Sequence, residues 1–84
     1  MSEVELILYG HPNCPLCRRL EKLLQPHLNK SHFSLRKHDI YDNDEWQRRY
    51  AQRVPVLTCS NRIILEGRPS EQELANSLDH LVTS

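Results

Sequence analysis

The sequence lacks a long apolar run and any net charge. Its 84 residues carry 11 basic and 11 acidic side chains, so the formal net charge is zero. Dedicated nucleic-acid binders carry a basic excess, and so do proteins held at membrane surfaces by charge. The longest apolar run, from Leu6 to Tyr9, is too short for a signal peptide and far below the ~20 residues of a membrane span. We therefore expect a soluble, cytoplasmic protein with neither nucleic acid nor membrane as a partner.

Glycine is also scarce, and proline is not abundant. The 2 glycines and 5 prolines exclude collagenous and low-complexity sequence. A chain of this length forms one small domain with a modest core. Because no repeat or linker divides it, we expect a single domain over residues 1–84, which works as a monomer.

Cysteine is rare too, and its pattern is informative. The chain has 3 cysteines, and an odd number makes a poor disulfide framework. Cys14 and Cys17 form a Cys-x-x-Cys pair, whereas Cys59 stands alone. In a reducing compartment such a pair is more often catalytic or metal-binding than structural. The pair is therefore the first candidate for a functional site.

Hydrophobic periodicity predicts strands that alternate with helices. Segments typical of strands cover residues 4–9, 33–40, 56–59 and 62–66. Leucines at helical spacing follow the cysteine pair and predict a first helix. A capping box of Asp42 with Glu45 predicts the start of a second helix. A box of Ser70 with Glu73 predicts the third, so the chain begins with a βαβ unit of two parallel strands.

The position of the cysteine pair, directly after a strand and at the start of a helix, favours redox chemistry. The thiolate is the nucleophile in disulfide exchange, and a helix N-terminus offers free N–H donors and the positive end of its dipole. Cys14 lies at that end, so we expect it to be exposed and to attack a substrate disulfide. Cys17 lies one turn further, so we expect it to be more buried and to resolve the mixed disulfide. Positive groups on His11, Arg18 and Arg19 would favour the thiolate.

Two other interpretations of the pair stay open. Zinc needs four ligands, so Cys59 with one of the 5 histidines would have to complete a site. An iron–sulfur centre shared between subunits belongs to the same class of metal-binding module. Alternatively, the thiols are inert and the domain serves as an adaptor. The metal content of the purified protein separates the metal-binding module from a redox enzyme.

The run from Tyr9 to Cys17, which ends in Cys-Pro-Leu-Cys, resembles the active-site turn of glutaredoxins. Val54-Pro55 resembles the Val-Pro of that family, whose proline is cis. The resemblance implies an α/β, thioredoxin-like fold, β-α-β-α-β-β-α, whose four-stranded mixed sheet has the order second–first–third–fourth and is flanked by helices. It implies an enzyme, a thiol–disulfide oxidoreductase without a bound cofactor, in which Cys14 is the nucleophile and Cys17 the resolving residue. Its partners would be disulfide-containing proteins, with glutathione as a possible co-substrate.

The resemblance also implies a substrate-binding surface beside the cysteines. The backbone of Val54, held by a cis Pro55, would pair with a bound substrate as a short antiparallel strand. The other positions that match this surface are His11, Pro15, Leu16, Gly67 and Ser70. The resemblance implies no metal ligand.

This chain departs from the family pattern at the positions that bind glutathione. Leu16 replaces a common Tyr, and His11 replaces a common Lys that holds a glutathione carboxylate. Gly67 is followed by Arg68 and Pro69 instead of a second glycine. An imidazole is only partly charged near neutral pH, and proline offers no N–H. We therefore expect weak glutathione binding that improves below neutrality.

Two remaining features have ordinary structural explanations. Cys59 alternates with Leu57 in a predicted strand, so we expect a small buried side chain. Arg48, Arg49 and Arg53 form a local basic patch. We interpret this patch as a solvated helix face more readily than as a guide for acidic partners.

Overall fold

The structure, a computed structural model, describes residues 4–30 and 33–83. Its elements are β1 (Val4–Gly10), α1 (Pro15–Lys30), β2 (Phe33–Asp39), the 3-10 helix η1 (Ile40–Asp42), α2 (Asp44–Tyr50), β3 (Val56–Cys59), β4 (Arg62–Glu66) and α3 (Glu71–Thr83). This is the expected order with one addition, the short η1 between β2 and α2. None of the helices in the described residues has the length and apolar character that a membrane span requires.

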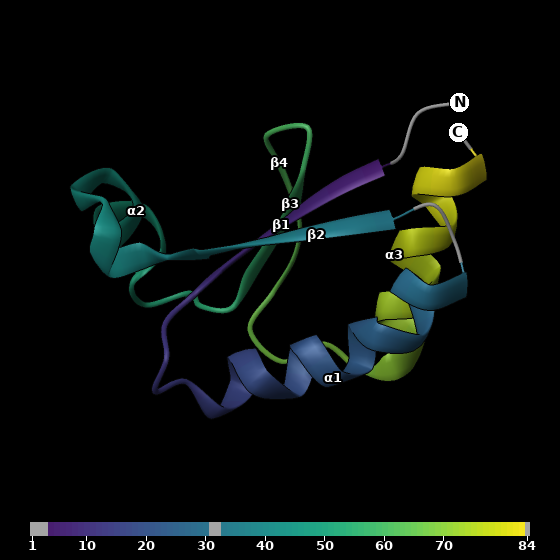
Figure 1. Ribbon diagram of the computed structural model, residues 1–84, viewed down its shortest axis with the longest axis horizontal. Helices are drawn as coiled ribbons and strands as arrows, with labels where there is room; N and C mark the ends of the chain where they lie inside the picture. Colours follow the sequence, from purple (N-terminus) through teal and green to yellow (C-terminus); the bar gives the residue numbers. More distant parts are fainter. Residues whose placement is uncertain (1–3, 31–32, 84) are drawn as a thin grey trace.

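The 4 strands form one mixed sheet in the order β2-β1-β3-β4 (Figure 1). β1 and β2 are parallel, and α1 connects them as the expected crossover. β3 pairs with β1 antiparallel, with Tyr9 opposite Val56, and β4 completes the hairpin. β2 lies at an edge of the sheet, which explains why it carries the charged Arg36 and Lys37. The fold class and the strand order expected from the sequence are confirmed.

The main core lies between the sheet and the helices α1 and α3, which Figure 1 shows on the same side of the strands. It consists mostly of leucines at the predicted spacing: Leu6, Leu8, Leu20, Leu24, Leu57, Leu74 and Leu78, together with Phe33. α1 continues through Pro26, so that Leu28 also packs against this core. Burying one such side chain contributes about 1.5–3 kcal/mol. This layer therefore fixes α1, and with it the cysteine pair at the start of α1.

A smaller cluster lies on the opposite face of the sheet, under η1 and α2. Its members are Ile40, Tyr50 and Val56, which are buried, and Tyr9, Trp46 and Val54, which are half-buried. Tyr9 and Val56 reach this face because side chains alternate along a strand. The Tyr9 ring lies beside those of His38 and Tyr50, with centroid distances of 5.5 and 4.6 Å. An aromatic layer thus supports the chain that leads into β3.

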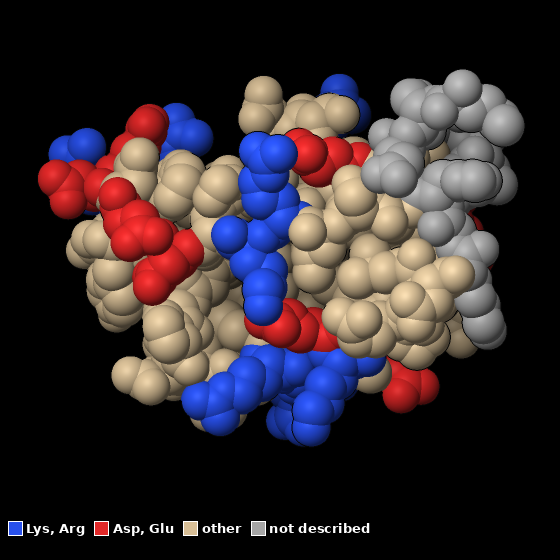
Figure 2. Space-filling model, viewed as in Figure 1, with Lys and Arg blue, Asp and Glu red and all other residues tan. Residues whose placement is uncertain are grey.

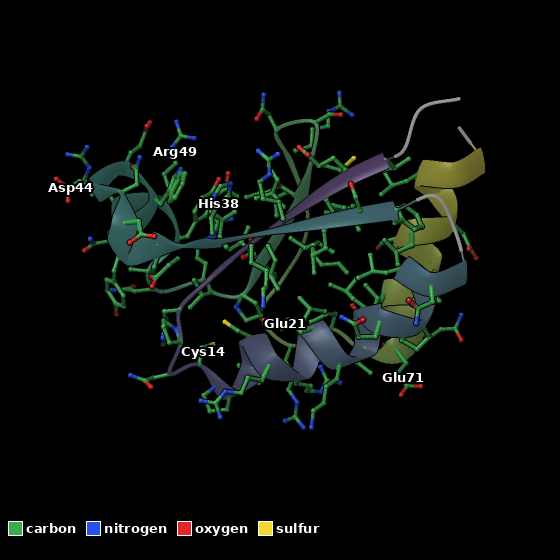
Figure 3. The ribbon with its side chains drawn as sticks, viewed as in Figure 1. Cys14, Glu21, His38, Asp44, Arg49 and Glu71 are labelled. Carbon is green, nitrogen blue, oxygen red and sulfur yellow. The ribbon has the colours of Figure 1, made fainter. Side chains whose placement is uncertain are left out.

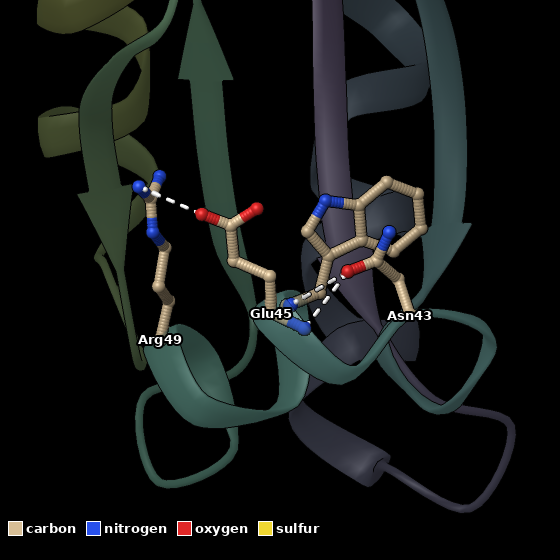
Figure 4. A network of polar contacts seen from close by, with 4 residues as sticks. Asn43, Glu45 and Arg49 are labelled. Atoms are coloured by element: carbon tan, nitrogen blue, oxygen red, sulfur yellow. Dashed lines mark hydrogen bonds and ion pairs between the residues drawn. The ribbon is translucent and has the colours of Figure 1, made fainter.

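The start of α2 differs from the expectation. Asn43, not Asp42, is the N-cap: its Oδ1 accepts hydrogen bonds from the N–H groups of Glu45 and Trp46, at 2.9 and 3.2 Å (Figure 4). Asp42 instead ends η1, which Asp39 caps. Asp and Asn are equally good N-caps, so the spacing alone could not decide between these neighbours. The additional η1 turn is what moves the helix start by one residue.

Candidate active site

Cys14, labelled in Figure 3, lies together with Cys17 at the start of α1. Cys14 directly precedes the helix, Cys17 lies in its first turn, and both are free thiols. The Cys17 backbone N–H donates to Cys14 Sγ at 3.2 Å. The sulfur of Cys14 thereby binds one of the N–H groups that the first turn of a helix leaves without a helical partner.

Cys14 is buried, which corrects the expectation that it would be exposed. Its exposed fraction is 6%, close to the 5% of Cys17. The cause is local, because its side chain turns back to reach the Cys17 N–H instead of extending into solvent. Pro15 and Leu16 carry the exposed surface between the cysteines, and Leu16 exposes 37%. A substrate disulfide would therefore approach Cys14 over a partly apolar rim.

Cys17 is buried as expected, on the side of α1 that carries Leu20 and Leu24. Burial, and then the hydrogen bond that its thiol donates to Cys14, raises the pKa of Cys17 to about 12, whereas a hydrogen bond from the His11 backbone N–H acts in the opposite direction. Both the thiol and the N–H of Cys17 thus point at the Cys14 sulfur. The Cys14 sulfur thus faces the first turn of α1, at the positive end of the helix dipole. The two cysteines are chemically unequal, and Cys17 is the one that keeps its proton.

Gly10, the last residue of β1, passes directly behind Cys17. A Cβ atom at this position would lie 2.7 Å from Cys17 Sγ and 3.3 Å from Cys17 Cβ. Atoms do not approach this closely without displacement, so only glycine leaves Cys17 its present position. Nothing in the sequence pattern around Gly10 predicts this contact.

The Val54–Pro55 peptide bond is cis, as the resemblance implied. β3 begins at Val56, opposite Tyr9, so this bond lies at the end of the sheet from which the chain leaves β1 for the cysteines. Gly67 has a φ of 74° and donates its N–H to the Pro55 carbonyl at 2.9 Å. The structure therefore brings together the implied residues Val54, Pro55 and Gly67.

Of the two backbone groups of Val54 that were expected to pair with a substrate, the N–H already forms a hydrogen bond within the protein. Its N–H donates to the Tyr50 carbonyl at 3.0 Å, and the Arg53 N–H donates to the same oxygen at 2.8 Å. Antiparallel pairing needs an N–H and a carbonyl from the same residue. A substrate strand would thus find the Val54 carbonyl, but would have to displace the turn after α2 to reach the N–H.

The positive groups near the cysteines hold other parts of the protein. Arg18 donates to the Pro12 carbonyl at 3.0 Å, and Arg19 donates to the Pro69 carbonyl at 2.7 Å. The His11 ring lies 5.6 Å from the ring of Tyr41, between centroids. The two arginines thus tie α1 to the loops on either side of it, a role that the sequence analysis missed.

Ser70 is occupied by the expected capping box at the start of α3. Its Oγ accepts a hydrogen bond from the Glu73 N–H, and its own N–H donates to Glu73 Oε1, both at 3.1 Å. The first turn of α3 carries Glu71 as well as Glu73. The capping prediction is confirmed, and the same contacts engage the groups that a ligand carboxylate would use.

The basic patch of Arg48, Arg49 and Arg53 is not a free cationic surface. Arg49 pairs with Glu45 at 3.1 Å, and Arg53 pairs with Glu66 at 2.6 Å. In Figure 2 the basic side chains instead gather along α1, at the lower edge, and in a column over β2. The solvated helix face is therefore the better interpretation of this patch.

Among the described residues, Cys59 and the histidines form no metal site with the cysteine pair. Within residues 4–30 and 33–83, no three His, Cys, Asp or Glu side chains are arranged to hold a metal ion. His32, one of the possible ligands, lies outside the described residues. Cys59 is half-buried and packs against the leucine core, less deeply than expected.

An open cavity of about 300 Å³ lies on the far side of Cys17 from Pro15 and Leu16, between α1 and the edge strand β2. Gly10, Cys17, Glu21 and Lys37 are among the residues that line it. Glu21 lies four residues after Cys17, a spacing that places both on one helix face. The sequence alone predicts this shared helix face. It does not predict the cavity, because the cavity also requires the edge strand β2.

A family model, the Glutaredoxin-like domain (DUF836), matches residues 5–79. The match runs from β1 into α3 and includes both cysteines of the pair. The chain belongs to the glutaredoxin-like domain family. The resemblance carried by the Cys-Pro-Leu-Cys and Val-Pro motifs is thereby confirmed.

Solved structures with this fold agree with the membership in the glutaredoxin-like family. Protein Ne2328 from Nitrosomonas europaea is 27% identical, with a TM-score of 0.76 over 90% of this chain and 92% of its own. A mutant thioredoxin from Halobacterium salinarum is 23% identical, with a TM-score of 0.67 over 94% and 74% of the two chains. A glutaredoxin from Archaeoglobus fulgidus is 19% identical, with a TM-score of 0.62 over 89% and 86%. The latter two likenesses establish the thioredoxin-like fold.

Proposed function

We propose that this glutaredoxin-like protein is a thiol–disulfide oxidoreductase in which Cys14 attacks and Cys17 resolves. The observation that carries the proposal is the inequality of the two cysteines. Cys14 Sγ accepts the Cys17 N–H at 3.2 Å at the start of α1, whereas burial and the bond to Cys14 keep the Cys17 thiol protonated. This is the arrangement that a nucleophile and a waiting second thiol require.

The reaction takes two exchange steps. The Cys14 thiolate attacks a substrate disulfide, forms a mixed disulfide and releases one substrate sulfur as a thiolate. Cys17 then loses its proton and attacks Cys14 Sγ, so that the Cys14–Cys17 bond forms and the second substrate sulfur leaves. The substrate gains two electrons and the protein loses them. An external thiol reductant restores the dithiol, so the cycle needs no resident cofactor.

Capture of a substrate by Cys14 also prepares Cys17 for the second step. Once Cys14 is part of a disulfide, it carries no negative charge and no longer holds the Cys17 thiol by a strong hydrogen bond. Two of the causes that raise the pKa of Cys17 then disappear, while the hydrogen bond from the His11 N–H, which lowers it, stays. Burial of the sulfur and the negative charge of Glu21 then remain as the causes that raise the pKa of Cys17.

We infer that disulfide-containing proteins are better substrates than glutathione mixed disulfides. Three groups that glutathione would need are engaged within the protein: the Val54 N–H with Tyr50, and the N–H and Oγ of Ser70 with Glu73. The acidic first turn of α3 further disfavours a ligand carboxylate. A protein segment can instead use the apolar rim of Pro15 and Leu16 together with the Val54 carbonyl.

We propose that the protein acts as a monomer. A reducing cytoplasm would keep the pair as thiols, and we propose this location. An NMR titration with glutathione at two pH values tests the inferred weakness of its binding. We expect small shifts that grow below neutrality; tight binding that does not change with pH would contradict the inference.

Single-cysteine variants test the redox function. Turnover of a protein disulfide with dithiothreitol as reductant should be lost in Cys14→Ser. Cys17→Ser should accumulate a mixed disulfide with the substrate on Cys14, visible by mass spectrometry. Cys59→Ser is the matched control and should keep full activity, because Cys59 lies outside the pair. Full activity in Cys14→Ser, or equal loss in Cys59→Ser, would refute the assignment.

A further inference from the structure

The buried Cys17 thiol must lose a proton before it can act, and the substrate side of the pair offers no obvious acceptor. The Cys17 N–H and thiol both point at Cys14, and the rim there consists of Pro15 and Leu16, which carry no ionisable group. On its other side Cys17 lines the cavity between α1 and β2, whose volume is about 300 Å³. A cavity of this size has room for ordered water beside polar groups.

Glu21 is the acidic group of α1 that lines the same cavity. It lies one helical turn beyond Cys17, on the same face of the helix. Figure 3 places Glu21 between α1 and the strand β2. Its carboxylate meets Lys37 Nζ at 3.4 Å, and its side chain exposes only 34%. This long pairing engages Oε2 of Glu21, so Oε1 is available to accept a hydrogen bond.

We propose that the Glu21 carboxylate accepts the Cys17 proton in the second exchange step, through water held in this cavity. The step rests on the proposed dithiol reaction. The Cys17 Sγ–H bond breaks and its proton passes to Glu21, while the Cys17 thiolate forms the bond to Cys14 Sγ. The bond between Cys14 and the substrate breaks, and the departing substrate thiolate takes up a proton from Glu21 or from solvent.

The other titratable groups that line the cavity are less suited to this task. Asp39 Oδ1 accepts the Tyr41 N–H at 2.9 Å as the cap of η1. Asp42 also lines the cavity but is exposed to solvent. The His11 ring lies against Tyr41, and the His38 ring lies against Trp46 on the opposite face of the sheet, at 4.5 Å between centroids. Lys37, as an ammonium group, has no lone pair to offer.

The two exchange steps can be timed separately with dithiobis(nitrobenzoate), which releases one coloured thiolate per step. All proteins carry Cys59→Ser so that only the pair reacts. The first release reports attack by Cys14 and the second reports resolution by Cys17. In Glu21→Gln the first phase should be unchanged, and the second should slow by about 100-fold at neutral pH, the contribution typical of a general base. The deficit should shrink as pH rises, because hydroxide then removes the Cys17 proton.

Two further variants separate proton transfer from structure. Lys37→Gln removes the ion pair but keeps the carboxylate, so its second phase must slow less than that of Glu21→Gln. Glu45→Gln, which removes a carboxylate that pairs with Arg49 on α2, should match the parent in both phases. Equal slowing in Glu21→Gln and Lys37→Gln, or no slowing in Glu21→Gln at any pH, would overturn the proposal. A parent protein without a second release would instead refute the dithiol reaction itself.

Discussion

The two faces of the sheet differ in the side chains that cover them and in the part of the candidate site that they support. The face under α1 and α3 is filled with leucines that are almost fully buried. The face under η1 and α2 holds a smaller cluster, in which the rings of Tyr9, His38, Trp46 and Tyr50 pack against one another. One face is a dry apolar core, and the other is an aromatic layer with polar atoms at its edge.

Each face supports one side of the candidate active site. The leucine core holds α1, which carries Cys17 and Glu21 and directly follows Cys14. The aromatic layer includes Val54 and Val56, so it holds the chain on either side of the cis Pro55. Damage to the leucine core should therefore reduce stability most, whereas damage beside the cysteines should change chemistry at a smaller cost in stability.

The largest effect is expected from Leu20→Ala on the leucine face. Leu20 is fully buried, and truncation of such a residue costs about 2–5 kcal/mol. Leu28→Ala on the same helix is the matched control, because Leu28 is only half-buried, and it should cost clearly less. Urea unfolding measures both. Equal costs at the two positions would mean that the leucine core is not organised as described.

A smaller loss of stability, with a specific chemical defect, is expected from Gly10→Ala. The new Cβ would lie 2.7 Å from Cys17 Sγ, so the sulfur must move. Overpacking of this kind costs about 1–3 kcal/mol. In a Cys17→Ala background the same change should cost less, because the sulfur is gone, and this non-additivity is the diagnostic result. Strict additivity of the two changes would show that Gly10 does not contact Cys17 as described.

The fold could be predicted in most respects because its signals are local. Leucine spacing predicted α1, and the Ser70–Glu73 box marked the start of α3 correctly. The start of α2 was misplaced because two adjacent residues, Asp42 and Asn43, are both able to cap. A choice between them depends on η1, a turn that has no strong sequence signal.

The site was predicted less completely because its details depend on contacts between distant segments. The sequence identified Cys14 and Cys17 but not the inward rotamer that buries Cys14. The engagement of the Val54 N–H by Tyr50 follows from how α2 ends. The position of Glu21 beside the cavity depends on its ion pair with Lys37, which lies on the strand β2. Pattern and resemblance supply the residue types, whereas these partners are set only when the chain is folded.

The last prediction concerns the loss of stability of the reduced protein at alkaline pH. This effect is the smallest at neutral pH, and it compares the two faces of the sheet most directly. Each face shields a weak acid from solvent, Cys17 almost fully and Tyr9 in part. The pKa of Cys17 rises from 9.0 to about 12, mainly through burial. The pKa of Tyr9, on the aromatic face, is raised from 10.0, mainly by burial and then by the neighbouring Tyr50. The fold thus favours the neutral form of both groups.

The sign of the pH effect follows from proton linkage. Above its ordinary pKa each group is ionised in the unfolded chain while it is still neutral in the folded protein. This ionisation lowers the free energy of the unfolded state, so the free energy of unfolding falls as pH rises. Unfolding in urea under reducing conditions should reveal a loss that begins above pH 9.0 for Cys17 and above pH 10.0 for Tyr9. Cys17→Ala should reduce the loss of stability that begins above pH 9.0. Tyr9→Phe, which keeps the ring, should reduce only the loss that begins above pH 10.0. If Tyr9→Phe removed the decline near pH 9.0 and Cys17→Ala did not, the leucine face would not bury its cysteine as a protonated thiol.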